Sequence, residues 1–276
     1  MLVNLKTHKH QPLKNTLNPR FGWSRNAPPA AYSLMLSRDD YDPQHQPTPA
    51  FIHKVAPFLM RNDNLNLPGF LLIPNLDQHI PSRHLNRFLE KAVIDLKRHL
   101  AQAYDTLFNP QQVPLTIIKK RQVDGEIGQD GNLHNEDTQG KWTLKSPHFD
   151  RNALMVLHRY EPTENLEDGN LQVMDLRQFL QDHPDEQLSD MLNPDKTIKK
   201  IYWEKLEPYK LTLDTNSRQH QIVFLNNSPQ NGIAHGVTPL KITDGAKPFK
   251  RIFERFTITP FEPDKKLPAD VSRIEE

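Results

Sequence analysis

Residues 146–160 read SPHFDRNALMVLHRY, in which a short polar motif runs directly into an apolar, β-prone segment. His148 and Asp150 lie two positions apart, just before the strand that we predict over residues 153–160. Side chains two positions apart point to the same side of an extended chain, so this imidazole and carboxylate can bind one metal ion from adjacent directions. His-x-Asp alone is a weak signal, because 13 His and 34 acidic residues make a chance match common. The structural alternative is a strand-edge His148 beside a turn-forming Asp150.

A second histidine comes from a small-residue, apolar segment far along the chain. Residues 232–237 read GIAHGV, and His235 lies 87 positions after His148 (235 − 148 = 87). Two histidines and one carboxylate can form the facial triad of non-haem Fe(II) proteins, which leaves coordination positions open. The alternative is a buried, hydrogen-bonded histidine with a structural role. The chain has no cysteine, so His, Asp and Glu are the available side-chain ligands.

One long amphipathic helix and a series of short strands organise the rest of the chain. Between about residues 82 and 108, apolar residues recur at steps of three and four, which predicts a helix that buries one face. From residue 113 onwards, β-prone runs alternate with polar turns. The predicted strands cover residues 113–118, 153–160, 171–174, 201–203, 211–213, 222–225 and 251–258, and a short helix is predicted over residues 176–182. This pattern predicts a mainly β fold, a sandwich or barrel with supporting helices.

The order of these motifs resembles that of the Fe(II)/2-oxoglutarate-dependent dioxygenases. The similarity covers about residues 113–258 and includes His148-x-Asp150, a turn containing Gly169, His235 and a final strand with basic residues. It implies a double-stranded β-helix (jelly-roll) core in which His148, Asp150 and His235 bind Fe(II). It further implies 2-oxoglutarate and O2 as cosubstrates and hydroxylation of an unactivated C–H bond. Related halogenases have a small residue in place of the carboxylate, so Asp150 argues against halogenation.

Two arginines on the last long strand are candidates for the cosubstrate anchor that the resemblance implies. In the family, an Arg after the second histidine binds the far carboxylate of 2-oxoglutarate, a role suited to the paired donors of a guanidinium. Arg251 follows His235 by 16 positions (251 − 235) and Arg255 by 20 (255 − 235), and both point to one face of a strand. Arg251 is preferred for its spacing, and Arg255 remains the competitor. The alternative for each is an exposed edge-strand charge.

Composition narrows the classes of function. The formal net charge is +1, from 35 basic and 34 acidic residues, so we expect no nucleic-acid partner. The N-terminal sequence lacks a secretory signal and no stretch reaches the roughly 20 apolar residues that span a bilayer, so we expect no membrane association and a cytoplasmic protein. The sequence does not indicate an oligomeric state. We expect a small-molecule substrate, such as an amino acid or a natural-product intermediate. The alternatives are a protein or peptide hydroxylase and a non-catalytic β-helix that binds a ligand.

The N-terminal region differs in composition from the rest of the chain. Residues 1–50 are rich in proline, asparagine and glutamine and show neither helical nor strand periodicity. We expect them to form an arm, a candidate lid, that packs through Phe21 or Trp23. The loop over residues 126–145 is a second candidate lid. Residues 51–276 are expected to form a single double-stranded β-helix domain supported by the long helix.

Overall fold

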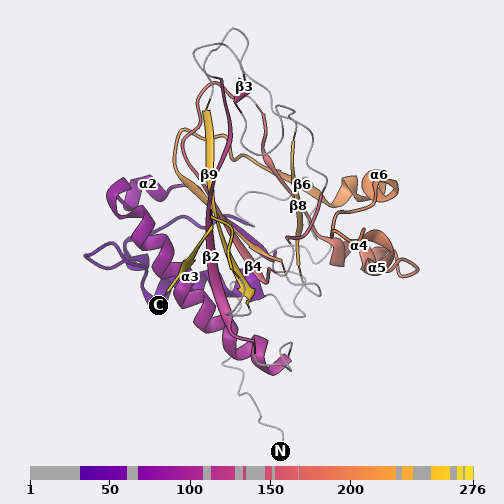
Figure 1. Ribbon diagram of the computed structural model, residues 1–276, viewed down its shortest axis with the longest axis horizontal. Helices are drawn as coiled ribbons and strands as arrows, with labels where there is room; N and C mark the ends of the chain where they lie inside the picture. The colour runs from indigo at the N-terminus through magenta and orange to yellow at the C-terminus, as the bar shows by residue number, and fades with distance from the viewer. Residues whose placement is uncertain are drawn as a thin grey trace, which may run out of the picture.

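The fold is largely antiparallel β-sheet with several helices, as predicted (Figure 1). The computed structural model describes residues 32–60, 68–107, 113–127, 133–134, 147–150, 153–166, 168–227, 232–238, 250–261, 266–269 and 271–275. Phe21, Trp23 and most of the loop over residues 126–145 therefore lie outside the described residues. The two candidate lids and the domain boundary at residue 50 stay predictions.

A larger sheet contains seven strands among the described residues, and all of its strand pairs are antiparallel. Its order is β1 (Phe70–Ile73), β7 (Gln221–Asn226), β4 (Met155–Tyr160), β9 (Lys250–Pro260), β2 (Leu115–Ile127) and β10 (Val271–Ile274), with β3 (Leu133–His134) paired to β2. β2, β4, β7 and β9 correspond to four of the predicted strands. β4 and β7 are buried at every position, because both faces of the sheet are covered there.

A smaller sheet of three antiparallel strands packs against one face of the larger sheet. It contains β6 (Lys210–Leu213), β5 (Leu171–Met174) and β8 (Ala234–Val237), in that order. Side chains from both sheets form one hydrophobic cluster, which includes Phe70, Leu72, Val156, Tyr160, Leu171, Val173, Leu211, Leu213, Val223 and Leu225. The chain changes sheet after β4, after β6, after β7 and after β8. The chain segment from β4 to β9 thus crosses repeatedly between the two sheets.

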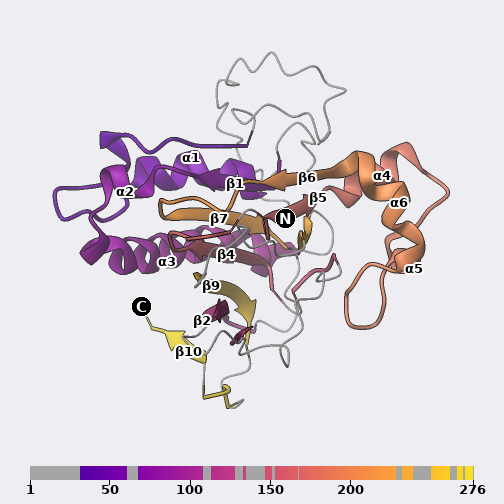
Figure 2. The ribbon, with the colours of Figure 1, turned by 90° about the horizontal axis from the view of Figure 1, so that it is seen from above.

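Helices cover the other face of the larger sheet (Figure 2). The predicted long helix is α3 (Ser82–Leu107), and it buries one stripe of side chains as expected: Leu85, Phe88, Leu89, Ala92, Val93 and Leu96. α1 (Pro49–Met60) contacts β1, β7 and α3, and the short α2 (Leu76–His79) precedes α3. α1 is not among the predicted elements; it contains Pro57, which lacks the N–H that a helix interior uses. Among the described helices, none is both long and apolar enough to cross a membrane.

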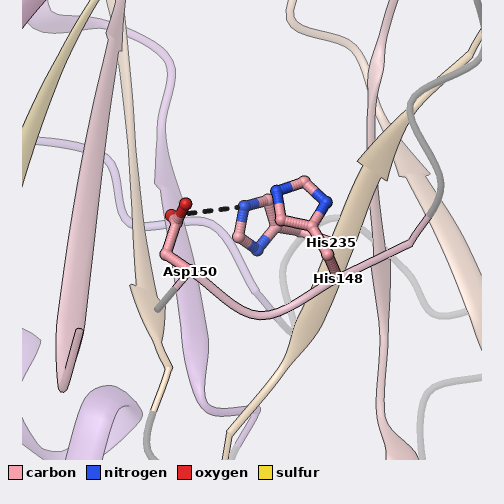
Figure 3. Close-up of side chains that lie close together, drawn as sticks. All are labelled: His148, Asp150 and His235. Carbon is pink, nitrogen blue, oxygen red and sulfur yellow. Dashed lines mark ion pairs between the residues drawn. The ribbon is translucent and has the colours of Figure 1, made fainter. Parts of the chain in front are cut away.

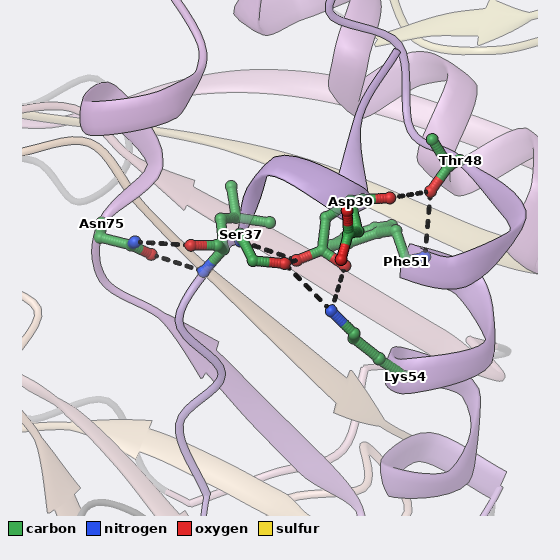
Figure 4. Close-up of polar contacts among 8 residues, drawn as sticks. Ser37, Asp39, Thr48, Phe51, Lys54 and Asn75 are labelled. Atoms are coloured by element: carbon green, nitrogen blue, oxygen red, sulfur yellow. Dashed lines mark hydrogen bonds and ion pairs between the residues drawn. The ribbon is translucent and has the colours of Figure 1, made fainter.

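The described part of the N-terminal region is fastened to the domain by polar contacts (Figure 4). The amide of Asn75 accepts from the main-chain N–H of Leu36 at 2.9 Å and donates to the carbonyl of Leu36 at 3.3 Å. Asp40 is fully buried in a 3-10 turn, η2 (Arg38–Asp40), and pairs with Lys54 of α1 at 2.7 Å. Residues 32–48 are therefore bound along the sheet and α1 rather than detached from them.

A helical insertion separates β5 from β6. It contains α4 (Leu176–Asp182), α5 (Leu188–Met191), α6 (Trp203–Leu206) and the 3-10 turns η3 (Lys200–Tyr202) and η4 (Glu207–Tyr209). α4 coincides with the predicted short helix. The strand predicted over residues 201–203 is wrong, because these residues form η3 and the start of α6. Strand alternation would bury Ile201 beside Trp203, whereas the structure leaves Ile201 76% exposed and buries Tyr202 between them.

A buried ion pair joins the larger sheet to α3. Arg159 of β4 and Glu254 of β9 are 7% and 4% exposed, and their side chains meet at 2.6 Å, beside Asn86 of α3. Glu254→Ala should lower the free energy of unfolding by about 3–5 kcal/mol, because it leaves a buried guanidinium without its nearer carboxylate, with Glu161 remaining at 3.7 Å. Urea denaturation measures this loss.

The matched control for that prediction is Glu90→Ala, since Glu90 contacts Lys119 from a side chain that is 40% exposed. It should change the free energy of unfolding by less than about 1 kcal/mol. Replacing both buried partners, as Arg159→Met with Glu254→Leu, should recover much of the loss. Equal losses for Glu254→Ala and Glu90→Ala would contradict the role given to the buried pair.

Candidate metal centre

His148 and His235 lie opposite each other on paired main chains. The N–H of His148 donates to the carbonyl of His235 at 2.8 Å, and the N–H of His235 donates back to the carbonyl of His148 at 2.9 Å. His235 belongs to β8, whereas His148 forms an isolated bridge that adds to the free edge of β8. His148 therefore lies beside the smaller sheet, and β4 begins later, at Met155. The two imidazole rings have centres 4.5 Å apart.

The helical insertion holds the His148 segment on its other side. The N–H of Ile198 donates to the carbonyl of Pro147 at 2.7 Å, and the N–H of Phe149 donates to the carbonyl of Lys196 at 3.1 Å. Lys196 adopts a positive φ of 69°, which is uncommon outside glycine and closes the turn that makes this contact. His148 is thus fixed between two main chains.

Asp150 is positioned by the residue that follows β7. The side-chain oxygen of Asn227 accepts from the N–H of Asp150 at 3.0 Å, and its side-chain nitrogen donates to the carbonyl of Asp150 at 2.8 Å. The same nitrogen donates to the carbonyl of Ala153 at 2.9 Å. These contacts hold the main chain of Asp150 at the end of the larger sheet, facing the two histidines of the smaller one.

The three side chains predicted as metal ligands come together at one point (Figure 3). His148, Asp150 and His235 each offer a ligating atom, and these atoms all lie within 4.8 Å of one another. Asp150 Oδ2 is 3.5 Å from His235 Nε2. His235 is 4% exposed, and Asp150 and His148 are partly buried.

The surroundings keep these groups in the forms that bind metals. Burial raises the pKa of Asp150, but the opposing effects of His235, Arg255, His158 and His148 are larger, and the pKa falls to about 2. Burial, together with the neighbouring His148, holds the pKa of the His235 imidazole well below its ordinary range. At neutral pH the site therefore presents a carboxylate and a neutral imidazole, the protonation states that coordinate a cation.

The two candidate arginines of β9 have different neighbours. Arg255 donates to Asp150 Oδ1 at 2.9 Å, so its guanidinium lies beside the proposed metal ligands. Arg251 is 2% exposed, donates to the carbonyl of Gly169 and lies over the ring of Tyr160, 5.4 Å from the ring centre. Both arginines face the smaller sheet and the site, in agreement with strand alternation. Neither is an exposed edge-strand charge.

One further histidine at the site is absent from the sequence predictions. His158 of β4 is 6% exposed, is paired with Arg255 across the sheet, and has its ring centre 5.6 Å from that of His235. Its Nδ1 is 3.3 Å from the hydroxyl of Tyr160. The available signal is an imidazole on the strand face that it shares with Val156 and Tyr160.

Comparisons with known proteins give weak similarities only. No protein-family model and no curated protein matches the chain. A solved BsmA homologue from Methylobium petroleophilum is 15% identical, with a TM-score of 0.31. The match covers 66% of this chain and 54% of the homologue, so the chain spans about half the length of that protein. AAD-2, solved with Mn(II) and N-oxalylglycine, is 13% identical, with coverages of 86% and 96% and a TM-score of 0.40. A taurine dioxygenase from Burkholderia xenovorans is 12% identical, with coverages of 90% and 94% and a TM-score of 0.40. At these values the similarities assign no family, and the functional conclusion rests on the side chains of the site.

Proposed function

We propose that this protein is an Fe(II)- and 2-oxoglutarate-dependent oxygenase that hydroxylates an unactivated C–H bond of a small molecule. The observation that carries the proposal is the meeting of His148, Asp150 and His235, whose ligating atoms lie within 4.8 Å of one another although the chain separates them by up to 87 positions (235 − 148). Two histidines and one carboxylate are the donor set that non-haem Fe(II) oxygenases use, and this set leaves positions open for a chelating cosubstrate.

The surroundings of the three side chains fit a bound cation. Asp150 Oδ2 and His235 Nδ1 are buried, and neither has a hydrogen-bond partner among the described residues. A buried carboxylate oxygen without a donor is costly unless a cation neutralises it. Oδ2 is also the oxygen that faces His235 Nε2, so both atoms can bind the same ion. With Fe(II) and 2-oxoglutarate bound, a site of this kind couples oxidative decarboxylation of the keto acid, to succinate and CO2, with transfer of one oxygen atom of O2 to a C–H bond.

Arg251 is our candidate for binding the far carboxylate of 2-oxoglutarate. Arg255 contacts Asp150, so its guanidinium lies at the end where the keto acid would chelate the metal. Arg251 lies four residues away on the same face, roughly 13 Å along a strand that rises about 3.3 Å per residue. Its burial supports this role, because charge-assisted hydrogen bonds to a carboxylate are strongest where water is excluded. The role of Arg255 is to orient and neutralise the carboxylate of Asp150.

A double-stranded β-helix is the fold that we propose for the core. Between β4 and β9 the chain crosses repeatedly from one antiparallel sheet to the other, which supports this topology. His148 and His235 would then belong to one sheet and Arg251 and Arg255 to the other, with the cosubstrate between the sheets. The net charge of +1 supports a small-molecule substrate rather than a nucleic acid, because it provides no field for binding phosphates.

The test is anaerobic addition of Fe(II) and 2-oxoglutarate to the metal-free protein. We expect the weak visible charge-transfer band of a keto acid chelated to Fe(II), followed by slow succinate formation when O2 is admitted. Asp150→Ala should lose both signals. Asp185→Ala, which removes an exposed carboxylate between α4 and α5, should keep both. Metal binding without the band and without succinate would contradict the oxygenase and indicate a ligand-binding module.

A further inference from the structure

We infer that Asn227 is the positioning residue of the carboxylate ligand, and that its side-chain amide determines how tightly the site binds its metal. The inference rests on the proposed function, because it explains how one ligand of the proposed metal site is held. Asn227 lies directly after β7 and is 2% exposed.

The side chain of Asn227 substitutes for a strand partner of Asp150. Its oxygen accepts from the N–H of Asp150 at 3.0 Å, and its nitrogen donates to the carbonyl of the same residue at 2.8 Å. Asn227 is itself fixed, because its main-chain N–H donates to the carbonyl of Leu154 at 2.9 Å and its side-chain nitrogen donates to the carbonyl of Ala153 at 2.9 Å. One amide thus links the end of β7 to both main-chain polar groups of the ligand residue.

The carboxylate ligand differs from the two histidines in how it is held. The main chains of His148 and His235 bond to each other, so a side-chain substitution at either position leaves that bridge in place. Besides Asn227, the described residues give the main chain of Asp150 one long contact with a neighbouring main chain, from the N–H of Ala153 at 3.4 Å. Among the described residues, Asn227 is thus the side chain that holds the main chain of Asp150, and Arg255 contacts its carboxylate. The main chains of the histidines need no such side chain.

The chemistry of the contact is specific to asparagine. The residue must accept one hydrogen bond and donate two from the same short, planar group, and a primary amide does this. Alanine loses all three bonds. Aspartate keeps the length and the acceptor but loses the donors, and it turns an oxygen toward the carbonyls of Asp150 and Ala153. Movement of Asp150 would change both of its carboxylate contacts, Oδ1 with Arg255 and Oδ2 with His235.

Anaerobic titration of the metal-free protein with Co(II), followed by its d–d absorption, tests the inference without any turnover. We expect Asn227→Ala to bind Co(II) about tenfold to a hundredfold more weakly than wild type, the usual range for outer-shell partners of metal ligands, and to change the d–d spectrum because the carboxylate is no longer oriented. Asn226→Ala is the matched control. Asn226 is the same residue type, is 8% exposed, and donates its side-chain amide to the carbonyl of Leu59 in α1. The control should lower the free energy of unfolding and leave the Co(II) affinity and spectrum unchanged.

Asn227→Asp gives a second, independent test of the positioning role if the alanine variant does not fold. Electrostatics alone predicts tighter cation binding for this variant, because it adds a negative charge near the site. The positioning role predicts weaker binding, because the donors to Asp150 and Ala153 are lost. Unchanged or tighter Co(II) binding in Asn227→Asp would overturn the inference, as would equal losses of affinity in Asn227→Ala and Asn226→Ala. Failure of the metal site looks different: wild type itself would bind no Co(II), or His235→Ala would bind it as well as wild type, and the inference would then fall with the site. Failure of the oxygenase alone, with no chelate band and no succinate, would leave the Co(II) results unchanged.

Discussion

His235→Ala should abolish metal-dependent consumption of 2-oxoglutarate and weaken metal binding by more than about a hundredfold, since losing a ligand costs more than losing an outer-shell partner. The fold should survive. The hydrogen bonds between His235 and His148 run through the main chain, which alanine keeps. The imidazole also carries a buried Nδ1 that has no hydrogen-bond partner among the described residues, so its removal offsets part of the cost of the cavity. Metal titration and circular dichroism on the same preparation measure the two effects.

The control for this prediction is His220→Ala. His220 precedes β7, and its main-chain N–H donates to Asp77 at 2.8 Å, a contact that the substitution preserves. This variant should bind metal as wild type does. Unfolding of His235→Ala would point to a structural histidine, and metal-dependent turnover in that variant would remove His235 from the ligand set.

Arg251→Ala should raise the dissociation constant for 2-oxoglutarate by about tenfold to 150-fold at saturating Fe(II). This range follows from the roughly 1.5–3 kcal/mol that a hydrogen bond to a charged group contributes, at about 1.4 kcal/mol per factor of ten. Arg251→Lys should recover part of the affinity, because it restores the charge but not the paired donors. Anaerobic titration of 2-oxoglutarate, followed at the charge-transfer band, measures each constant.

Arg255→Ala distinguishes the proposed role of Arg255 from that of Arg251. Because Arg255 contacts Asp150 at 2.9 Å, its loss should weaken metal binding and leave the affinity for 2-oxoglutarate nearly unchanged once the metal is saturating. Weaker 2-oxoglutarate binding in the Arg255 variant alone would reverse the assignment. Unchanged 2-oxoglutarate binding in both variants would show that neither arginine of β9 binds the far carboxylate.

The secondary structure was predictable where periodicity and burial agree. β5 and α4 coincide with the predicted strand and helix over residues 171–174 and 176–182, and α3 ends one residue before its predicted end at about 108. Prediction failed where tertiary contacts override local preference. The β-prone residues 201–203 form helical turns because Tyr202, and not its neighbours, supplies the buried side chain. α1 accommodates Pro57 because the helix is packed against β1, β7 and α3.

The candidate ligands were predictable from motif order, whereas their supports were not. His148, Asp150 and His235 carry residue types and spacings that indicate a metal site. The contacts that orient Asp150 come from Asn227, 77 positions away, and Arg255, 105 positions away. Periodicity shows which face of a strand a residue occupies, but it does not show which strand lies beside it. These contacts could therefore be identified only from the structure, which shows how the strands and sheets lie against one another.

The long sequence separation between the bridged residues His148 and His235 also affects the stage of folding at which a metal ion could bind. The bridge closes a segment of 87 positions (235 − 148), and the entropy lost in that closure is recovered only after β4, β5, β6 and β7 have packed. A growing chain that has not yet added β8 has two of the three proposed ligands, so the proposed function implies that the ion would enter a fold that already contains β4 to β7 and would not nucleate one. A bound ion would stabilise that fold by mass action, by about 2.7 kcal/mol at a concentration one hundred times its dissociation constant. The proposed function therefore implies that metal depletion lowers the stability of this protein as well as its activity.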